Sequence, residues 1–175
     1  MDKKSHRIFL VGIMGAGKSF FAKKLGAHYN IPVFDTDSMI EAKEGVSVSG
    51  IFARADGEMA FRQMERHLLQ ETAWPGSCVV SCGGGLPCFF DNMEFMVAHG
   101  LVVWINPLAE TITARLWEER ESRPLVAGCA TPAELMAKIE ELLSNRAPYY
   151  NMAHLVWDGQ GEMAHFLEKL KTIGM

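Results

Sequence analysis

The chain has 175 residues, a formal net charge of -4 at pH 7 and a hydrophobic fraction of 49%. A chain of this length can bury a core of its own, so we expect a single domain over residues 1–175. The acidic balance argues against a nucleic-acid-binding protein, because such domains usually carry a concentrated basic face. No apolar run near the N-terminus is long enough for a signal peptide or a membrane helix, and we therefore expect a cytoplasmic protein without a membrane partner.

Short apolar runs alternate with longer amphipathic stretches along the chain. The apolar runs predict strands at residues 8–11, 32–34, 78–81, 101–105 and 155–157. The stretches between them predict helices at residues 19–29, at several places up to 74, at 91–99, 108–119 and 132–144, and after the last strand up to about 170. Strands that alternate with helices pair in parallel through right-handed crossovers. Because the runs lack polar alternation, both faces of the sheet should be covered, which predicts an α/β fold of three layers.

Residues 12–19 read Gly-Ile-Met-Gly-Ala-Gly-Lys-Ser, directly after the first predicted strand and before the first predicted helix. This is a Walker A loop, in which the glycines let backbone N–H groups turn towards phosphate oxygens. Lys18 would reach the β- and γ-phosphates and the Ser19 hydroxyl would ligate Mg²⁺, while the helix dipole adds to the anion site. The alternative is a glycine-rich turn with an exposed lysine. The order of strand, loop and helix favours a nucleoside triphosphate site.

Two aspartates, Asp35 and Asp37, follow the second predicted strand. In an open parallel sheet the carboxyl ends of the strands line the ligand crevice, so both carboxylates could face the triphosphate. One could hold Mg²⁺ through water, and the other could orient or deprotonate an acceptor hydroxyl. The alternative is a strand-end turn with solvated aspartates.

Two further segments do not have the composition of a packed core. The triple glycine at residues 83–85 follows a predicted strand, where its conformational entropy is costly unless the backbone must approach something closely. Residues 120–128 are polar and basic and end in small residues, which is typical of a mobile loop. Both segments would have a purpose beside a phosphorylated ligand.

The segment around Arg62 has helical character, with Glu58 and Glu65 at neighbouring positions of the same face. An ordinary surface salt bridge between Glu58 and Arg62 explains this spacing without any function, because such pairs are frequent and contribute little stability.

Four cysteines occur in the chain, at positions 78, 82, 88 and 129. Three of them are close enough in sequence for a metal site to be considered. Cys78 and Cys82 lie in an apolar strand-like run, however, and no paired histidines accompany them. We therefore expect buried or half-buried thiols rather than a metal site or a disulfide framework.

Six segments of the chain belong together: residues 12–19, Phe34-Asp35-Thr36-Asp37, Gly57-Glu58 with Phe61-Arg62, Ser81-Cys82-Gly83-Gly84-Gly85, Arg123-Pro124-Leu125 and Arg146-Ala147-Pro148-Tyr149-Tyr150. In their order and spacing they resemble the shikimate kinase family. Only the Walker loop is specific by itself, but all six in register are highly specific. The resemblance extends from residue 7 to about residue 157.

The resemblance implies a P-loop kinase fold with a five-stranded parallel sheet, a substrate-binding region at about 36–66 and a mobile lid at about 118–130. It implies transfer of the γ-phosphoryl group of ATP to the 3-hydroxyl of shikimate, with Mg²⁺ held by Ser19 and Asp35. Contacts to ATP are implied for Gly15, Ala16, Gly17, Lys18, Ser19, Phe20, Arg115 and Arg123. Phe20 stands where a threonine is frequent in that family.

On the acceptor side the resemblance implies that Arg62 and Arg146 grip the shikimate carboxylate, because guanidinium pairs with carboxylate through two parallel hydrogen bonds. Phe52 and Phe61 would pack around the ring, and the backbone N–H groups of Gly83, Gly84 and Gly85 would meet the same substrate. The catalytic residues implied are Lys18, Asp37 and Arg123, with Asp37 holding the hydroxyls and Arg123 closing over the phosphates.

Two other functions stay open. The acceptor could be gluconate or another small hydroxy acid, since related P-loop kinases share the fold. The chain could also be a non-catalytic nucleotide-binding module. Residues 157–160 lack the basic side chains often found beside the adenine in the resembled family, so base selectivity could be relaxed. The sequence predicts no exposed apolar helix that another protein would have to cover, and we therefore expect a monomer.

Overall fold

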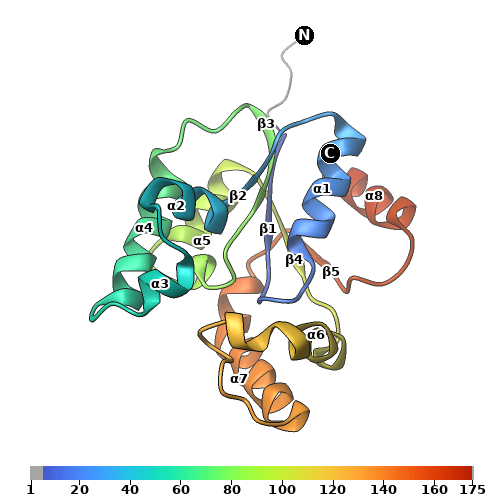
Figure 1. Cartoon of the computed structure of the whole chain (residues 1–175). Helices are drawn as coiled ribbons and strands as arrows, with labels where there is room; N and C mark the ends of the chain where they lie inside the picture. Colours follow the sequence, from blue (N-terminus) through green and yellow to red (C-terminus); the bar gives the residue numbers. More distant parts are fainter. Residues whose placement is uncertain (1–5, 175) are drawn as a thin grey trace.

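The computed structural model describes residues 6–174, apart from the side chain of Ser122. Its centre is a five-stranded parallel sheet with the strand order β2-β3-β1-β4-β5 (Figure 1). The strands are β1 (His6–Val11), β2 (Val33–Asp35), β3 (Ser77–Ser81), β4 (Leu101–Ile105) and β5 (Leu155–Trp157). The predicted five-stranded parallel sheet is confirmed.

Helices cover both faces of this sheet. They are α1 (Lys18–Tyr29), α2 (Thr36–Glu44), α3 (Val48–Phe52), α4 (Gly57–Glu71), α5 (Asn92–His99), α6 (Ala109–Leu116), α7 (Pro132–Tyr150) and α8 (Met163–Thr172), with short 3₁₀ helices η1 (Leu86–Cys88) and η2 (Trp117–Ser122). Ile8 and Leu10 of β1 join a core with α1 and α8, whereas Phe9 and Val11 join one with α4 to α7. Alternate residues of the central strand are therefore buried on opposite faces, and the predicted three layers are confirmed.

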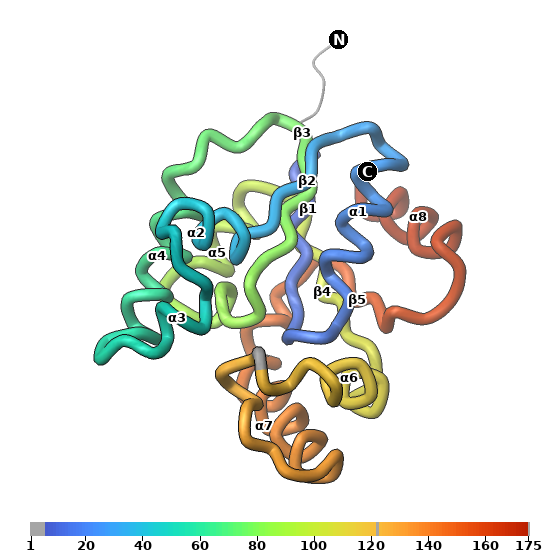
Figure 2. The backbone as a smooth tube through the Cα atoms, in the orientation of Figure 1, coloured from blue at the N-terminus to red at the C-terminus, as the bar shows by residue number. Residues whose placement is uncertain are grey.

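The carboxyl ends of the strands lead directly into the segments that the sequence singled out. β1 runs into the Walker loop, β2 into α2, and β3 into the triple glycine. In Figure 2 the group α2–α3–α4 lies on one side of these strand ends, and the chain between α6 and α7 passes close to the Walker loop. β3 lies between β2 and β1, and its register places Ser81 beside Asp35. The candidate site is therefore expected at this edge.

The segment after α6 contains more regular secondary structure than its composition predicts. The helix predicted over 108–119 ends at Leu116. The 3₁₀ helix η2 follows it directly and extends into the region expected to be a loop. The Arg120 guanidinium stacks 3.9 Å from the Trp117 ring centroid and donates to the Cys129 carbonyl at 3.0 Å. Val126 is buried in the core. The contact between Arg120 and Cys129 joins the two ends of the segment, and Val126 packs in the core, while the mobility of the segment stays a prediction.

Helix α7 is longer than predicted, because it continues past Ser144 to Tyr150. Pro148 lies in its last turn, where the missing N–H removes only one hydrogen bond. Arg146 and Tyr150, in that same turn, are both buried. The extra turn therefore brings two polar side chains into the interior.

All four cysteines are free thiols, with Cys78 and Cys82 buried and Cys88 and Cys129 half-buried. The prediction of buried or half-buried thiols is confirmed. Within residues 6–174 no helix is both long and apolar enough to cross a membrane.

Candidate active site

The Walker loop lies between β1 and α1, and Gly15 and Gly17 adopt positive φ angles of 74° and 99°. L side chains rarely adopt this conformation, so glycine suits both positions. The Lys18 ammonium folds back onto the loop and donates to the Ile13 carbonyl at 2.8 Å. Burial lowers the pKa of Lys18 to about 8, and the charge of Asp37 opposes this effect. Lys18 is thus a mostly protonated, largely dehydrated cation at neutral pH.

Three oxygen-bearing side chains meet where α1, β2 and β3 come together. The Ser19 hydroxyl donates to Asp35 Oδ2 at 3.1 Å and lies 3.3 Å from the Ser81 hydroxyl. The other Asp35 oxygen accepts the backbone N–H of Ser38 at 3.3 Å and caps α2. Hydroxyl and carboxylate oxygens are the donors that a small divalent cation prefers, so Ser19 and Asp35 fit such an ion.

Asp37 points into the site from the first turn of α2, and its Oδ1 atom is buried without a hydrogen-bond partner among the described residues. Burial raises the pKa of Asp37, the charge of Asp35 adds to the rise, and the charge of Lys18 opposes it. A raised pKa makes this carboxylate a better proton acceptor than an ordinary aspartate.

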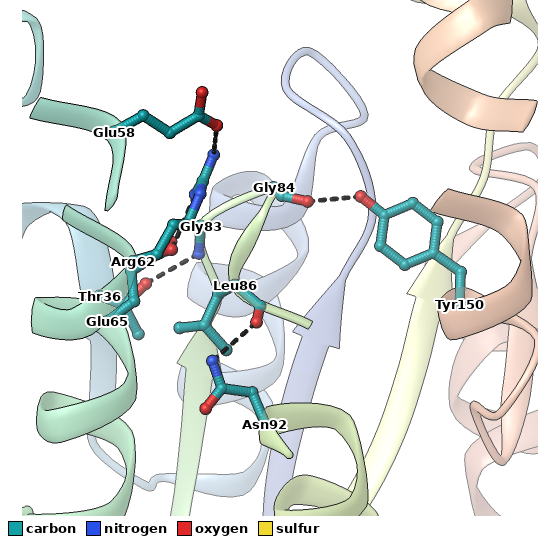
Figure 3. A network of polar contacts seen from close by, with 9 residues as sticks. All are labelled: Thr36, Glu58, Arg62, Glu65, Gly83, Gly84, Leu86, Asn92 and Tyr150. Carbon is teal, nitrogen blue, oxygen red and sulfur yellow. Dashed lines mark hydrogen bonds and ion pairs between the residues drawn. The ribbon is translucent and has the colours of Figure 1, made fainter. Parts of the chain in front are cut away.

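Arg62 is 2% exposed, so it is not the surface residue that its spacing from Glu58 allows. Its Nη1 donates to the fully buried Glu65 at 2.7 Å, and its Nη2 donates to Glu58 at 3.2 Å (Figure 3). The guanidinium carbon lies 5.6 Å from the Phe52 ring centroid and 4.5 Å from that of Phe89. Carboxylates and aromatic faces therefore hold this guanidinium in one orientation.

Glu65 predicts a measurable pH dependence of stability. Burial raises its pKa from 4.5 to about 7, although the Arg62 charge opposes the rise. The folded protein then holds this proton more tightly than the unfolded chain, so the free energy of unfolding should fall as pH rises from about 4.5 to about 7. The loss attributable to Glu65 is at most about 3 kcal/mol.

Urea unfolding of the wild type and of Glu65→Gln across this pH range tests the prediction. The difference between the two free energies of unfolding should change with pH, because glutamine does not titrate. Glu58→Gln removes the exposed partner of the same arginine and serves as the matched control. A constant difference between wild type and Glu65→Gln would contradict the raised pKa.

The triple glycine packs tightly against these charged groups. A side chain on Gly83 would approach Asp37 Oδ1 at 2.5 Å and Glu65 Oε1 at 2.6 Å, and one on Gly85 would collide with the Arg62 guanidinium. The Gly83 N–H donates to the Thr36 hydroxyl at 2.8 Å (Figure 3). The predicted close backbone approach is therefore confirmed, although the Gly83 N–H already has a partner within the protein.

Arg146 enters the site from the last turn of α7 and is 7% exposed. Its Nη1 atom is buried and has no hydrogen-bond partner within residues 6–174. The same holds for Asp37 Oδ1, Arg62 Nε and Glu65 Oε1. Buried polar atoms are nearly always hydrogen-bonded in native proteins, so a group of unpaired donors and acceptors in one place indicates a polar ligand site.

Two adjoining cavities bring most of the predicted residues together. The larger, about 700 Å³, is lined by the Walker loop residues Gly15, Gly17, Lys18 and Ser19 and by Phe20, Asp35, Asp37, Arg115 and Arg123. The smaller, about 80 Å³, is lined by Asp37, Phe52, Phe61, Arg62, Gly84, Gly85, Arg123 and Arg146. Asp37, Gly84 and Arg123 line both, so the two cavities meet at these residues. Ala16 and Gly83 line neither cavity.

The predicted lid stands over this meeting point. Arg123 and Pro124 line both cavities, and Leu125 lines the smaller one. The Arg123 guanidinium is partly exposed and pairs with Glu119 at 3.4 Å. Its charge also opposes the rise in the pKa of Asp37 that burial causes. Arg123 therefore acts electrostatically on the centre of the site.

Arg115 lies across the Walker loop and donates to the Gly15 and Ala16 carbonyls at 3.3 Å and 3.2 Å. With Phe20, which is 58% exposed, it also lines a third cavity of about 340 Å³ that reaches Gly159. This cavity shares Gly17, Phe20 and Arg115 with the cavity of about 700 Å³, and Arg62 lines neither of them. It is the place where a nucleotide base could extend from the phosphates.

Sequence reasoning missed several residues that shape the site. It assigned no role to Glu65, although the spacing of three residues from Arg62 on one helix indicated proximity. It also assigned no role to Phe89, whose ring lies under the Arg62 guanidinium, or to Tyr150, whose hydroxyl contacts Gly84 of the triple glycine. Their positions depend on how η1 and α7 pack in the folded protein, and local sequence patterns do not predict this packing.

Comparison with known proteins identifies the family. The family model described as shikimate kinase matches residues 14–172. A shikimate kinase of Parabacteroides distasonis is 42% identical over 154 residues, which are 88% of this chain and 88% of the relative. A shikimate kinase of Sulfurihydrogenibium sp. is 37% identical over 148 residues, covering 85% of this chain and 84% of the relative.

Solved structures agree in fold. The shikimate kinase of Bacteroides thetaiotaomicron has a TM-score of 0.80 at 34% identity, covering 96% of this chain and 95% of that one. The shikimate kinase of Acinetobacter baumannii, in complex with shikimate, has a TM-score of 0.82 at 31% identity, covering 95% and 90%. The five-stranded sheet, the Walker loop and the paired cavities thus occur in a chain that belongs to the shikimate kinase family.

Proposed function

We propose that this protein transfers the γ-phosphoryl group of ATP to the 3-hydroxyl of shikimate, giving shikimate 3-phosphate and ADP. One observation carries the proposal: the Walker loop cavity adjoins a cavity lined by Asp37, Arg62 and Arg146, each with a buried polar atom that has no hydrogen-bond partner among the described residues. The first cavity suits a triphosphate. The second suits a small molecule that carries both hydroxyl groups and a carboxylate.

The donor half would be formed by the Walker loop with Lys18, Arg115 and Phe20. Backbone N–H groups and the Lys18 ammonium would hold the phosphates, and the base would lie towards Arg115 and Gly159. Phosphoryl transfer through a loose transition state needs alignment and charge neutralisation more than strong chemical activation. The buried Lys18 is suited to neutralising phosphate charge, because its own charge acts in a medium of low dielectric constant.

The acceptor half would be formed by Arg62, Arg146, Phe52, Phe61 and the glycines. The two guanidinium groups would hold the carboxylate, and the two phenylalanine rings would pack on the ring of the substrate. Asp37 stands where the two cavities meet, so it would orient the acceptor hydroxyl towards the phosphate and take its proton as the new P–O bond forms.

Magnesium fits the oxygen donors at the end of β2. Ser19 would ligate the ion and Asp35 would support its shell of water. When bound, magnesium neutralises phosphate charge and helps to fix the geometry of the triphosphate. Lys18 and Arg123 supply the remaining positive charge.

Magnesium dependence gives a specific expectation for Ser19→Ala. The magnesium concentration that gives half-maximal activity should rise by about 10- to 100-fold, because one of the fitted oxygen donors is lost. Removal of divalent ions with a chelator should abolish turnover in both proteins. Ser38→Ala changes an exposed serine in the same cavity and is the matched control. An unchanged magnesium requirement in Ser19→Ala would argue against this ligand.

An ADP-release assay with purified protein tests the proposed function. Shikimate should stimulate ADP formation strongly, whereas gluconate and other small hydroxy acids should not. Stimulation by gluconate instead would assign a different acceptor. Tight ATP binding without turnover on any acceptor would indicate a non-catalytic nucleotide-binding module.

The remaining expectations belong to the same proposal. We expect a single domain with a mobile lid, acting as a monomer in the cytoplasm on its two small substrates. Sedimentation with and without both ligands would test the monomeric state.

A further inference from the structure

Tyr150 is the last residue of α7, and its side chain is fully buried. Its hydroxyl donates to the Gly84 carbonyl at 2.6 Å, and Figure 3 shows the ring pointing from α7 to the triple glycine. The neighbouring Tyr149 is 37% exposed. Of two adjacent tyrosines, one therefore holds the glycine segment and the other lies at the surface.

Gly84 occupies the boundary between the two cavities and lines both. A side chain there would lie 3.1 Å from the Met14 nitrogen of the Walker loop, 3.3 Å from Arg146 Nη1 and 3.4 Å from the Gly12 carbonyl. The Gly84 backbone is thus wedged between the phosphate-binding loop and a candidate substrate-binding arginine. A small displacement of Gly84 would change the spacing between the two halves of the site.

Tyr150 and Arg146 lie four residues apart on α7, so both project from the same face of the helix. Burial raises the pKa of Tyr150, and the positive charge of Arg146 is the largest opposing influence. The phenol therefore remains protonated and keeps its O–H to donate. One rigid helix turn thus presents Arg146 to the acceptor cavity and fixes Gly84 beside it.

We infer that Tyr150 is a positioning residue for phosphoryl transfer, whose hydroxyl holds Gly84 and thereby sets the acceptor cavity against the Walker loop. The inference rests on the proposed function, because it assigns the two cavities to acceptor and donor. Alignment of hydroxyl and phosphate dominates catalysis of this kind, so a loosened Gly84 should impair transfer more than nucleotide binding.

Tyr150→Phe removes one oxygen atom and leaves the ring. The value of kcat/KM for shikimate, measured at saturating magnesium and ATP, should fall about tenfold, equivalent to about 1.4 kcal/mol. The dissociation constant of ADP, measured by calorimetry, should not change. Tyr149→Phe removes the same atom from the exposed neighbour and should leave both quantities unchanged.

An unchanged kcat/KM in Tyr150→Phe would overturn the inference, as would an equal loss of ADP and shikimate binding, which indicates a merely structural role. If the variant is unstable at the assay temperature, both proteins are compared at a lower temperature at which the variant is folded. A value of kcat/KM for shikimate equal to that of the wild type at this temperature overturns the inference. Absence of shikimate phosphorylation in the wild type is a separate result, which would overturn the proposed function and this inference together.

Discussion

Replacing Arg123 with alanine is expected to lower kcat for shikimate phosphorylation by about a thousandfold or more. Arg123 lines both cavities at the point where the phosphoryl group would pass between them. Charge accumulates on the transferring oxygens in the transition state, and a guanidinium placed there stabilises that charge more than it stabilises bound ATP. The loss should therefore appear mainly in kcat.

The contact that Arg123 makes without ligands is compatible with a move of its guanidinium towards the phosphates when ligands bind. Its contact with Glu119 is long and partly exposed, and such pairs contribute little stability. The guanidinium can therefore leave Glu119 at little cost when phosphates are present. Alanine at this position should accordingly leave the free energy of unfolding nearly unchanged.

Arg66→Ala is the matched control for Arg123→Ala. Arg66 has similar exposure and also forms one ion pair, with Asp91, but it lies outside both cavities. Its loss should not alter kcat. Arg123→Lys should recover part of the activity, because it keeps the charge without the planar fork of donors. A fall in kcat of less than about tenfold in Arg123→Ala would exclude a central role in the transition state.

The donor half of the site was predictable because its information is local. A strand, the eight-residue motif at 12–19 and the start of a helix specify the Walker loop, and the two aspartates lie at the end of the next strand and in the first turn of the helix after it. The separation of β1 and β2 within the sheet could not be predicted from the sequence in the same way. β3 lies between them and contributes Ser81, so the oxygen-rich group formed with Ser19 depends on strand order.

The acceptor half could not be built from local patterns alone. Arg62 and Glu58 have the spacing of a surface pair, and only the packing of α4 against the triple glycine shows that Arg62 is buried. Arg146 comes from a helix predicted to end before it. The resemblance to shikimate kinases supplied these residues, whereas Glu65 and Tyr150 became visible through their buried contacts.

Arg62→Leu is expected to produce two separate losses. Affinity for shikimate should fall about a hundredfold or more, because truncating one partner of a buried charged pair typically costs several kcal/mol. The free energy of unfolding should also fall, by about 1–3 kcal/mol, because the buried Glu65 carboxyl loses its hydrogen-bond partner. Calorimetric titration with shikimate and urea unfolding measure the two effects, and ADP binding should be retained.

The double variant Arg62→Leu/Glu65→Met separates these losses. Replacing both members of a buried ion pair with apolar side chains is often neutral for stability, so much of the lost unfolding free energy should return. Shikimate binding should not return, because neither new side chain can pair with a carboxylate. If the double variant regained both stability and affinity, the single variant would have failed only through the unpaired Glu65. Restored stability without restored binding would assign the Arg62 guanidinium to the substrate, with Glu65 as the group that holds it in place.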